Sequence, residues 1–187
     1  TNEIIKASIP GGNDKYPVKA WMVAGTNLLQ SIPQTSVIEK AMENIEFLVV
    51  LDTMPMEITG YADVVLPECT YLERYDDLRS ATNREPSVAL RMPVAPPKYD
   101  SKPAWWVAKQ IGEKLGLKEY FNYTEYKETL AWQLEQIGSS LEEMEKIGVK
   151  TFPRKSGSMY LKEGENYTFG TPSGKIEFYS DQLAEKG

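Results

Sequence analysis

Apolar residues gather in three short continuous runs within the first third of the chain. The runs lie in VKAWMVAG (residues 18–25), EFLVVLD (46–52) and DVVLP (63–67), and the second holds five consecutive apolar residues. An apolar run without a polar face is typical of a strand that is buried on both faces of a parallel sheet. The pattern therefore predicts three strands, each followed by a turn.

Between the first two runs the apolar spacing becomes helical. A helix is predicted over IPQTSVIEKAMENI (residues 32–45), with Pro33 in its first turn. Its apolar positions are Val37, Ile38, Ala41 and Ile45. A brief helix is also expected between the second and third strands. The alternation of strand and helix predicts an α/β fold with a Rossmann-like, doubly wound, mostly parallel sheet and helices on both faces.

The second half of the chain has a different character. Residues 68–100 are charged, aromatic and proline-bearing, which predicts a long ordered excursion. Three helices are predicted after it, over residues 102–117, 124–138 and 140–148. Ser139 or Ser140 is expected to cap the last of them. The apolar positions of the first include Trp106, Ile111 and Leu115, and the Trp105–Trp106 pair is expected to pack in the core.

Two short β-like pieces follow, SMYL (158–161) and KIEFYS (175–180), separated by glycine-rich turns. We interpret residues 151–187 as a small β-containing C-terminal extension. The whole chain, residues 1–187, is then one α/β domain with this extension and the excursion attached. The start and end of the sequence are those expected of a piece of a longer protein.

The composition excludes several classes of protein. Twenty-one basic and twenty-seven acidic side chains give a net charge of -6, without the positive footprint of a nucleic-acid-binding protein. Histidine is absent and cysteine occurs once, which excludes a Cys/His metal site, a Ser-His-Asp triad and an intrachain disulfide. No apolar run approaches the roughly 18 residues of a membrane span, so direct membrane insertion is not expected.

Polar residues follow the predicted strands at the places where α/β sheets bind ligands. Ligands bind beyond the carboxyl ends of parallel strands, and Gly25, Asp52 and Pro67 end the three strands here. Thr26, Asn27 and Ser31 follow the first strand and supply hydroxyls, a donor and an acceptor. Without further glycines, this loop is either a nucleotide site or an Asn-containing turn that enters a helix.

Each acidic candidate has a structural alternative. Asp52 could accept from ribose hydroxyls or guanine nitrogens, or it could cap the next short helix. Asp63 could be structural and accept from a turn amide. The remaining carboxylates have no basic partner fixed by the sequence, so they do not form an acid/base pair: Glu57, Glu68 and Glu73. Cys69 is expected to be a small buried apolar residue rather than a redox thiol.

In order along the chain, GTN (residues 25–27), LD (51–52), MEIT (56–59), YADVVLP (61–67) and FGTPSGKIEFYS (169–180) resemble the molybdopterin oxidoreductase family. Two departures affect the loop details: Leu28 replaces a proline, and MEIT replaces Thr-Glu-Thr-Ala. Within the family, the chain most resembles the catalytic subunit of thiosulfate and polysulfide reductases. Arsenate and tetrathionate reductases and formate dehydrogenases share this architecture.

The resemblance implies that this domain embraces one guanine dinucleotide of a molybdenum or tungsten bis-molybdopterin guanine dinucleotide cofactor. The matching positions imply the following cofactor-binding residues: Gly25, Asn27, Ser31, Leu51, Asp52, Thr53, Asp63 and Glu68. Asp63 and Glu68 are the weaker candidates. No catalytic residue and no metal ligand is implied within the chain, and the chain alone is expected to be inactive.

The resemblance also implies surroundings for the full-length protein. An iron-sulfur cluster would lie in a preceding N-terminal part. An iron-sulfur electron-transfer subunit and a membrane anchor would be partners. The location would be periplasmic or on the outer face of the cytoplasmic membrane, in anaerobic respiration. The alternative, from another class, is a stand-alone nucleotide- or protein-binding module.

Overall fold

The computed structural model describes residues 2–13, 15–81, 85–153 and 166–185. The chain divides into two compact units. The first comprises Thr1–Arg79 and Ala89–Val149, and the second comprises Ser80–Val88 and Lys150–Gly187. The longer segment of the second unit begins at Lys150, next to the predicted start of the C-terminal extension at residue 151. Its shorter segment, Ser80–Val88, belongs to the predicted excursion.

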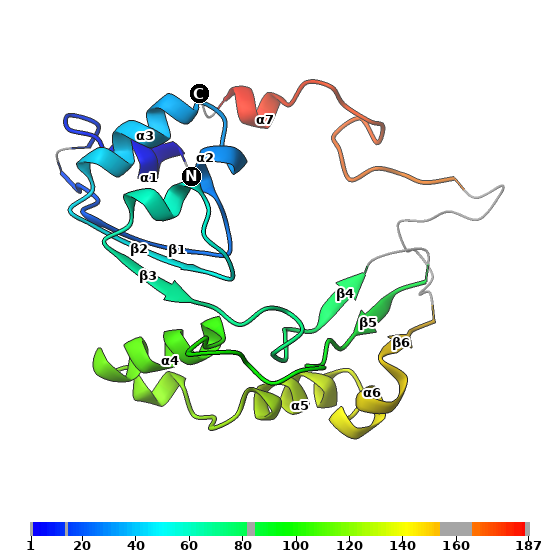
Figure 1. Ribbon diagram of the computed structural model, residues 1–187. Coiled ribbons are helices and arrows are strands. Elements are labelled where there is room, and N and C mark those ends of the chain that lie inside the picture. The colour runs from blue at the N-terminus through cyan, green and yellow to red at the C-terminus, as the bar shows by residue number, and fades with distance from the viewer. Residues whose placement is uncertain (1, 14, 82–84, 154–165, 186–187) are drawn as a thin grey trace. The chain divides into compact units, whose positions relative to one another are not determined.

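The first unit contains a three-stranded parallel sheet (Figure 1). Its strands β1 (Ala20–Ala24), β2 (Phe47–Asp52) and β3 (Val64–Pro67) lie in the order β1-β2-β3. In register, Ala24 faces Leu51, and Asp52 faces Pro67. All three strands therefore end at the same edge of the sheet, and the predicted α/β fold is confirmed.

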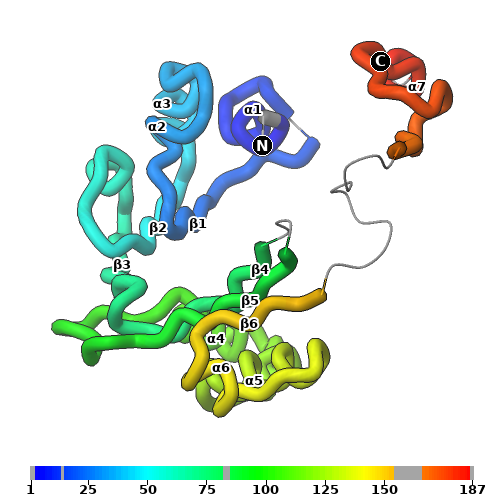
Figure 2. The backbone as a smooth tube through the Cα atoms, turned by 90° about the vertical axis from the view of Figure 1, so that its right-hand side faces the viewer, coloured from blue at the N-terminus to red at the C-terminus, as the bar shows by residue number. Residues whose placement is uncertain are grey.

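Helices α1 (Asn2–Ala7), α2 (Leu28–Ser31) and α3 (Thr35–Asn44) lie on one face of this sheet, as Figures 1 and 2 show. The short 3-10 helix η1 (Glu57–Tyr61) contributes to the same core. Alternate residues of a strand share a face. The buried core members are Ile5, Val23, Leu29, Ile38, Ala41, Met42, Leu48, Val50 and Ile58. Burial of this apolar surface is what stabilises the sheet.

The opposite face of the sheet is less covered than the apolar run in β2 predicts. Met22, Phe47 and Val64 alternate with the core positions and remain 37% to 46% exposed. Leu51, at the end of the same row, is 1% exposed. Coverage of this second face is therefore uneven: Leu51 is buried, whereas Ala24, its neighbour in β1, is exposed.

The predicted helices of the second half are present. They are α4 (Ala104–Lys114), the 3-10 helix η2 (Lys118–Tyr120), α5 (Tyr126–Gln136) and α6 (Leu141–Ile147). Helices α5 and α6 lie side by side (Figures 1 and 2) and share a core of Leu90, Leu130, Leu134 and Met144. Ser140 caps α6 by accepting from the Glu143 backbone N–H at 3.1 Å, as predicted.

Helix α4 buries a different face from the predicted one. Its buried positions are Val107 and Gly112. The ring of Phe121 packs against Gly112 so closely that a Cβ on the glycine would lie 2.1 Å from it. The missing side chain at this position therefore selects the buried face, and the apolar residues expected there are exposed: Trp106, Ile111 and Leu115. Trp105 is half-buried and stacks on Tyr126 at 5.7 Å between ring centroids.

Two further expectations need correction. Pro33 lies before α3 rather than in its first turn, because Gln34 precedes the helix with a left-handed backbone (φ 67°). KIEFYS is not a strand: the Ser173 backbone N–H donates to Glu177, and Thr171 donates to the Lys175 carbonyl. These local bonds form a turn before α7 (Asp181–Ala184). SMYL lies outside the described residues.

A second, small sheet is also present. It consists of β4 (Arg79–Ala81), β5 (Ser87–Ala89) and β6 (Val149–Thr151), in that order. None of the helices among the described residues is long and apolar enough to cross a membrane.

Candidate functional site

The loop after β1 turns away from the sheet at Gly25. This residue has φ +61°, a left-handed conformation that glycine adopts without steric cost. Its backbone N–H donates to the Leu51 carbonyl at 3.0 Å, which fixes the loop to the end of β2. The carbonyl of Leu51 is thereby already engaged within the protein.

Asn27 follows and precedes α2. Its backbone carbonyl accepts from the Gln30 and Ser31 N–H groups, at 3.1 and 2.9 Å. Its side-chain Nδ2 donates to Glu57 Oε2 at 2.5 Å. The Oδ1 atom is buried and has no hydrogen-bond partner. The contact with Glu57 therefore fixes the amide and leaves its acceptor atom unpaired.

The same loop carries a pair of hydroxyls. Thr26 Oγ1 and Ser31 Oγ lie 3.2 Å apart and share one hydrogen bond. Each hydroxyl has further donor or acceptor capacity beyond this bond. The loop therefore presents polar groups at both of its ends.

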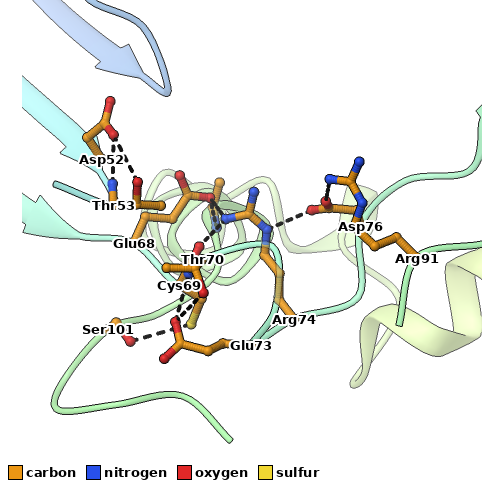
Figure 3. A network of polar contacts seen from close by, with 11 residues as sticks. Asp52, Thr53, Glu68, Cys69, Thr70, Glu73, Arg74, Asp76, Arg91 and Ser101 are labelled. Carbon is orange, nitrogen blue, oxygen red and sulfur yellow. Dashed lines mark hydrogen bonds and ion pairs between the residues drawn. The ribbon is translucent and has the colours of Figure 1, made fainter. Parts of the chain in front are cut away.

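Asp52 ends β2 next to this loop. Its Oδ1 accepts from the Thr53 backbone N–H at 2.7 Å and lies 3.4 Å from Thr53 Oγ1 (Figure 3). Its Oδ2 is buried and has no partner. The residue that precedes η1 is Met56, so Asp52 does not cap the next helix. The helix-capping alternative for Asp52 is therefore wrong, although Oδ1 does accept one backbone N–H.

Asp63 lies at the other edge of the sheet. It precedes β3, and its Oδ2 accepts from the backbone N–H of Leu48, near the start of β2, at 2.7 Å. This contact supports the structural alternative for Asp63 and separates it from the residues around Asp52.

Glu68 follows β3 and lies in a buried ion pair. It is 8% exposed, pairs with Arg74 and accepts from the Ala104 N–H at the start of α4 at 3.2 Å. Burial raises the pKa of the Glu68 carboxyl, and the charge of Arg74 opposes that rise. The basic partner that the sequence did not reveal is thus Arg74.

The neighbours of Glu68 are also structural. Cys69 is fully buried, and its thiol contacts Ser101 Oγ at 3.6 Å, in agreement with the prediction of a small buried residue. Glu73 accepts from the backbone N–H and the hydroxyl of Thr70, both at 2.8 Å, and these bonds lower its pKa. Neither residue offers a free reactive group.

The structure thus brings six of the eight candidate residues together at the carboxyl ends of β1 and β2: Gly25, Asn27, Ser31, Leu51, Asp52 and Thr53. Sequence reasoning missed Glu57 as the support of Asn27. The only signal for it is its place at the start of the short helix after β2.

Chemically, this edge is a set of hydrogen-bond acceptors and hydroxyls. Buried polar atoms in native proteins normally have partners. A ligand with N–H or O–H donors at this edge would supply partners for both Asn27 Oδ1 and Asp52 Oδ2. A purine base with amino and imino groups, or a ribose, has such donors. Among the residues that the structure describes, no cluster of three metal-ligating side chains occurs.

The fold agrees with the comparison to known families. The model of the molybdopterin oxidoreductase family matches residues 4–114, and the chain belongs to this family. The name of this family refers to a molybdopterin cofactor and to oxidoreductases.

The chain is also similar in sequence to individual proteins of known name. The chain is 32% identical to the molybdopterin-containing subunit PhsA of thiosulfate reductase from Salmonella typhimurium, over 91% of this chain and 25% of PhsA. It is 29% identical to a nitrate reductase from Synechocystis sp., over 86% of this chain and 24% of the relative. The chain therefore spans about a quarter of the length of these relatives.

A solved structure has the same fold. Acetylene hydratase from Pelobacter acetylenicus aligns with a TM-score of 0.73 over 98% of this chain and 24% of that one, at 24% identity. This likeness extends to both units of the chain and concerns the fold alone.

Proposed function

We propose that this chain is the α/β part of a molybdopterin-dependent reductase that holds one guanine dinucleotide of a bis-molybdopterin guanine dinucleotide cofactor. The nucleotide would lie against residues 25–31 and 51–53. One observation carries the proposal: Asn27 Oδ1 and Asp52 Oδ2 are buried, unpaired acceptors at one edge of the sheet.

The donors of a guanosine fit these acceptors. Guanine presents an imino N–H and an amino group side by side, and ribose presents hydroxyls. Asp52 Oδ1 is occupied by Thr53, so Oδ2 is the oxygen that remains for such a donor. A charge-assisted hydrogen bond of this kind is stronger than a neutral one. Asn27, held by Glu57, would accept a second donor from the nucleotide.

The other residues of the edge would shape the site. Gly25 allows the backbone to approach a ligand, and Ser31 with Thr26 offers hydroxyls to the sugar or phosphates. When bound, the metal and its pterins supply the redox chemistry, and these residues bind and orient the nucleotide end. Asp63 is not part of the proposed site. Glu68 supports it indirectly.

The proposed reaction of the full-length protein is reduction of thiosulfate or polysulfide in anaerobic respiration. The 32% identity to PhsA over most of the chain supports this substrate class. The similarity to a nitrate reductase supports nitrate as an alternative electron acceptor. Arsenate or tetrathionate reduction, formate oxidation and a stand-alone binding module are the remaining alternatives.

The proposed surroundings follow from the same reading. An iron-sulfur cluster in the remainder of the protein, an iron-sulfur electron-transfer subunit and a membrane anchor would carry electrons to the cofactor. The enzyme would act in the periplasm or on the outer face of the cytoplasmic membrane. Co-purification of these subunits with the full-length protein tests the proposed partners.

The test of the proposed function uses the full-length protein, purified without oxygen. Acid treatment should release guanosine monophosphate in proportion to bound molybdenum or tungsten. Reduced viologen should be oxidised with thiosulfate or polysulfide, and more slowly with nitrate, arsenate or tetrathionate. Absence of guanine nucleotide from the metal-loaded enzyme would overturn the cofactor proposal. Faster turnover of nitrate than of either sulfur compound would overturn the substrate proposal alone.

A further inference from the structure

A row of alternating acidic and basic side chains extends from the end of β3 into the excursion. Glu68, Arg74, Asp76 and Arg91 follow one another in this row, as Figure 3 shows. None of them belongs to the set of unpaired acceptors.

The first link joins the row to Asp52 through the backbone. The Glu68 N–H donates to the Asp52 carbonyl at 2.9 Å, where β3 leaves the sheet beside β2. A hydrogen bond to its carbonyl restrains the peptide that follows Asp52. It thereby restrains the direction from which the Asp52 carboxylate leaves the strand. The position of Glu68 therefore affects the position of Asp52.

The second link fixes Glu68 itself. A buried carboxylate is costly unless it is paired and hydrogen-bonded, and Glu68 has Arg74 and the Ala104 N–H as partners. The same carboxylate thus connects the end of β3, the excursion and the start of α4. Removal of its cationic partner would leave a buried charge, which the chain can relieve by moving Glu68 toward water or by protonating its carboxyl.

The third link is the geometry of Arg74. Its Nε donates to Asp76 Oδ1 at 2.7 Å, while its Nη1 contacts both Glu68 and the Cys69 carbonyl. Asp76 in turn pairs with Arg91 at 2.7 Å. A guanidinium can hold two carboxylates with separate nitrogens of one rigid plane, whereas a lysine ammonium is a single point charge. These contacts therefore fit arginine better than lysine.

We infer that Arg74 is a positioning residue for the nucleotide site: it holds Glu68, whose backbone holds Asp52 in the orientation that presents Oδ2 to the ligand. This inference rests on the proposed function. It assigns a binding role to a residue that touches no unpaired acceptor and that lies 22 positions beyond Asp52 in the sequence.

The test is a double-mutant cycle in the full-length enzyme. Bound guanine nucleotide is followed over time, as acid-released guanosine monophosphate that remains with the protein after gel filtration. Arg74→Gln should release nucleotide about tenfold faster than wild type, the size of effect typical for loss of a supporting hydrogen-bond partner. In the Asp52→Ala background, Arg74→Gln should add no further loss, because the carboxylate that it positions is gone.

Two further variants serve as controls. Arg91→Gln is the matched control: it removes an arginine from the same row that contacts Asp76 but not Glu68, and it should release nucleotide at the wild-type rate. Arg74→Lys retains the charge without the two-carboxylate geometry and should give an intermediate rate. This variant also serves if Arg74→Gln does not fold.

The outcomes separate the two proposals. If both Arg74 variants release nucleotide at the wild-type rate, the positioning role is overturned. It is also overturned if Arg74→Gln speeds nucleotide release by the same factor with and without the Asp52 carboxylate, because that result indicates a general loosening of the fold. If Asp52→Ala itself releases nucleotide at the wild-type rate, the proposed function fails instead. If Asp52→Ala releases nucleotide faster than wild type while Arg74→Gln releases it at the wild-type rate, only the positioning inference is overturned.

Discussion

The two edges of the parallel sheet use the same kinds of side chain for different purposes. At the amino edge, Asp63 accepts from the Leu48 N–H, and Lys19 pairs with Glu46 at 2.7 Å. At the carboxyl edge, Asp52 and Asn27 each keep a buried acceptor without a partner. An aspartate next to a strand is therefore not informative by itself: Asp52 keeps a buried carboxylate oxygen without a partner, whereas Asp63 uses its carboxylate to hold the backbone of β2.

The largest difference between the edges should appear on removal of a carboxylate. Asp52→Ala in the full-length enzyme should weaken retention of the guanine nucleotide by about 2 kcal/mol, roughly thirtyfold, the contribution of a hydrogen bond to a charged group. Thermal unfolding should change less than for Asp63→Ala, because Oδ2 has no partner within the protein and the bond lost from Oδ1 is an exposed one from the adjacent Thr53 N–H. Acid-released guanosine monophosphate measures retention, and unchanged retention would remove Asp52 from the site.

Gly25→Ala tests whether the carboxyl edge depends on its backbone turn. Alanine at φ +61° should cost about 1–2 kcal/mol in the free energy of unfolding, although no atom lies within 4 Å of the added Cβ. Gly60→Ala is the matched control, because its Cβ also meets open space and its backbone is not left-handed. Denaturant titration compares the two, and equal stability would contradict the account of Gly25.

Asp63→Ala should show the reverse of Asp52→Ala. Loss of the bond to the Leu48 N–H should lower the free energy of unfolding by about 1 kcal/mol. Nucleotide retention should stay at the wild-type value, because the contact lies at the other edge. The same two measurements apply, and a loss of nucleotide without a loss of stability would place Asp63 in the binding site after all.

The smallest effect concerns pH. Burial raises the pKa of Glu68, so its folded form binds a proton more tightly; its contribution to stability is present at acidic pH and is lost as pH rises through the raised pKa. The charged groups that act on it are Arg74, Asp52 and Asp76.

Glu73 shows the opposite behaviour. Hydrogen bonds from Thr70 lower the pKa of Glu73, so its contribution to stability is present near neutral pH and is lost as pH falls through that lowered pKa.

Glu68→Gln and Glu73→Gln should therefore change the slope of stability against pH in opposite directions. Denaturant titrations at several pH values below neutrality measure the two slopes. Changes of the same sign would show that the environments of these two carboxyls are not those described.

Features that depend on neighbours in the sequence could be predicted. The continuous apolar runs predicted β1, β2 and β3, and Ser140 before two glutamates predicted the start of α6. The parallel topology then placed residues 25–31 and 51–53 together, because parallel strands end at one edge.

Features that depend on contacts between distant segments could not be predicted from the sequence. The buried face of α4 is set by Phe121 against Gly112, although apolar spacing alone favours Ile111 and Leu115. Likewise, the pairing of Asn27 with Glu57 joins residues that are far apart in sequence. The unpaired state of Asp52 Oδ2 is a property of its surroundings, which no sequence pattern records.

Hydrogen–deuterium exchange on the full-length enzyme, with and without its cofactor, shows directly which edge of the sheet binds the nucleotide. We expect the cofactor to slow exchange in peptides that contain residues 25–31 and 51–53, while peptides limited to the amino edge, around residues 46–48 and 63, change far less. Equal protection at both edges, or protection at the amino edge alone, would contradict a nucleotide site at the carboxyl edge of the sheet.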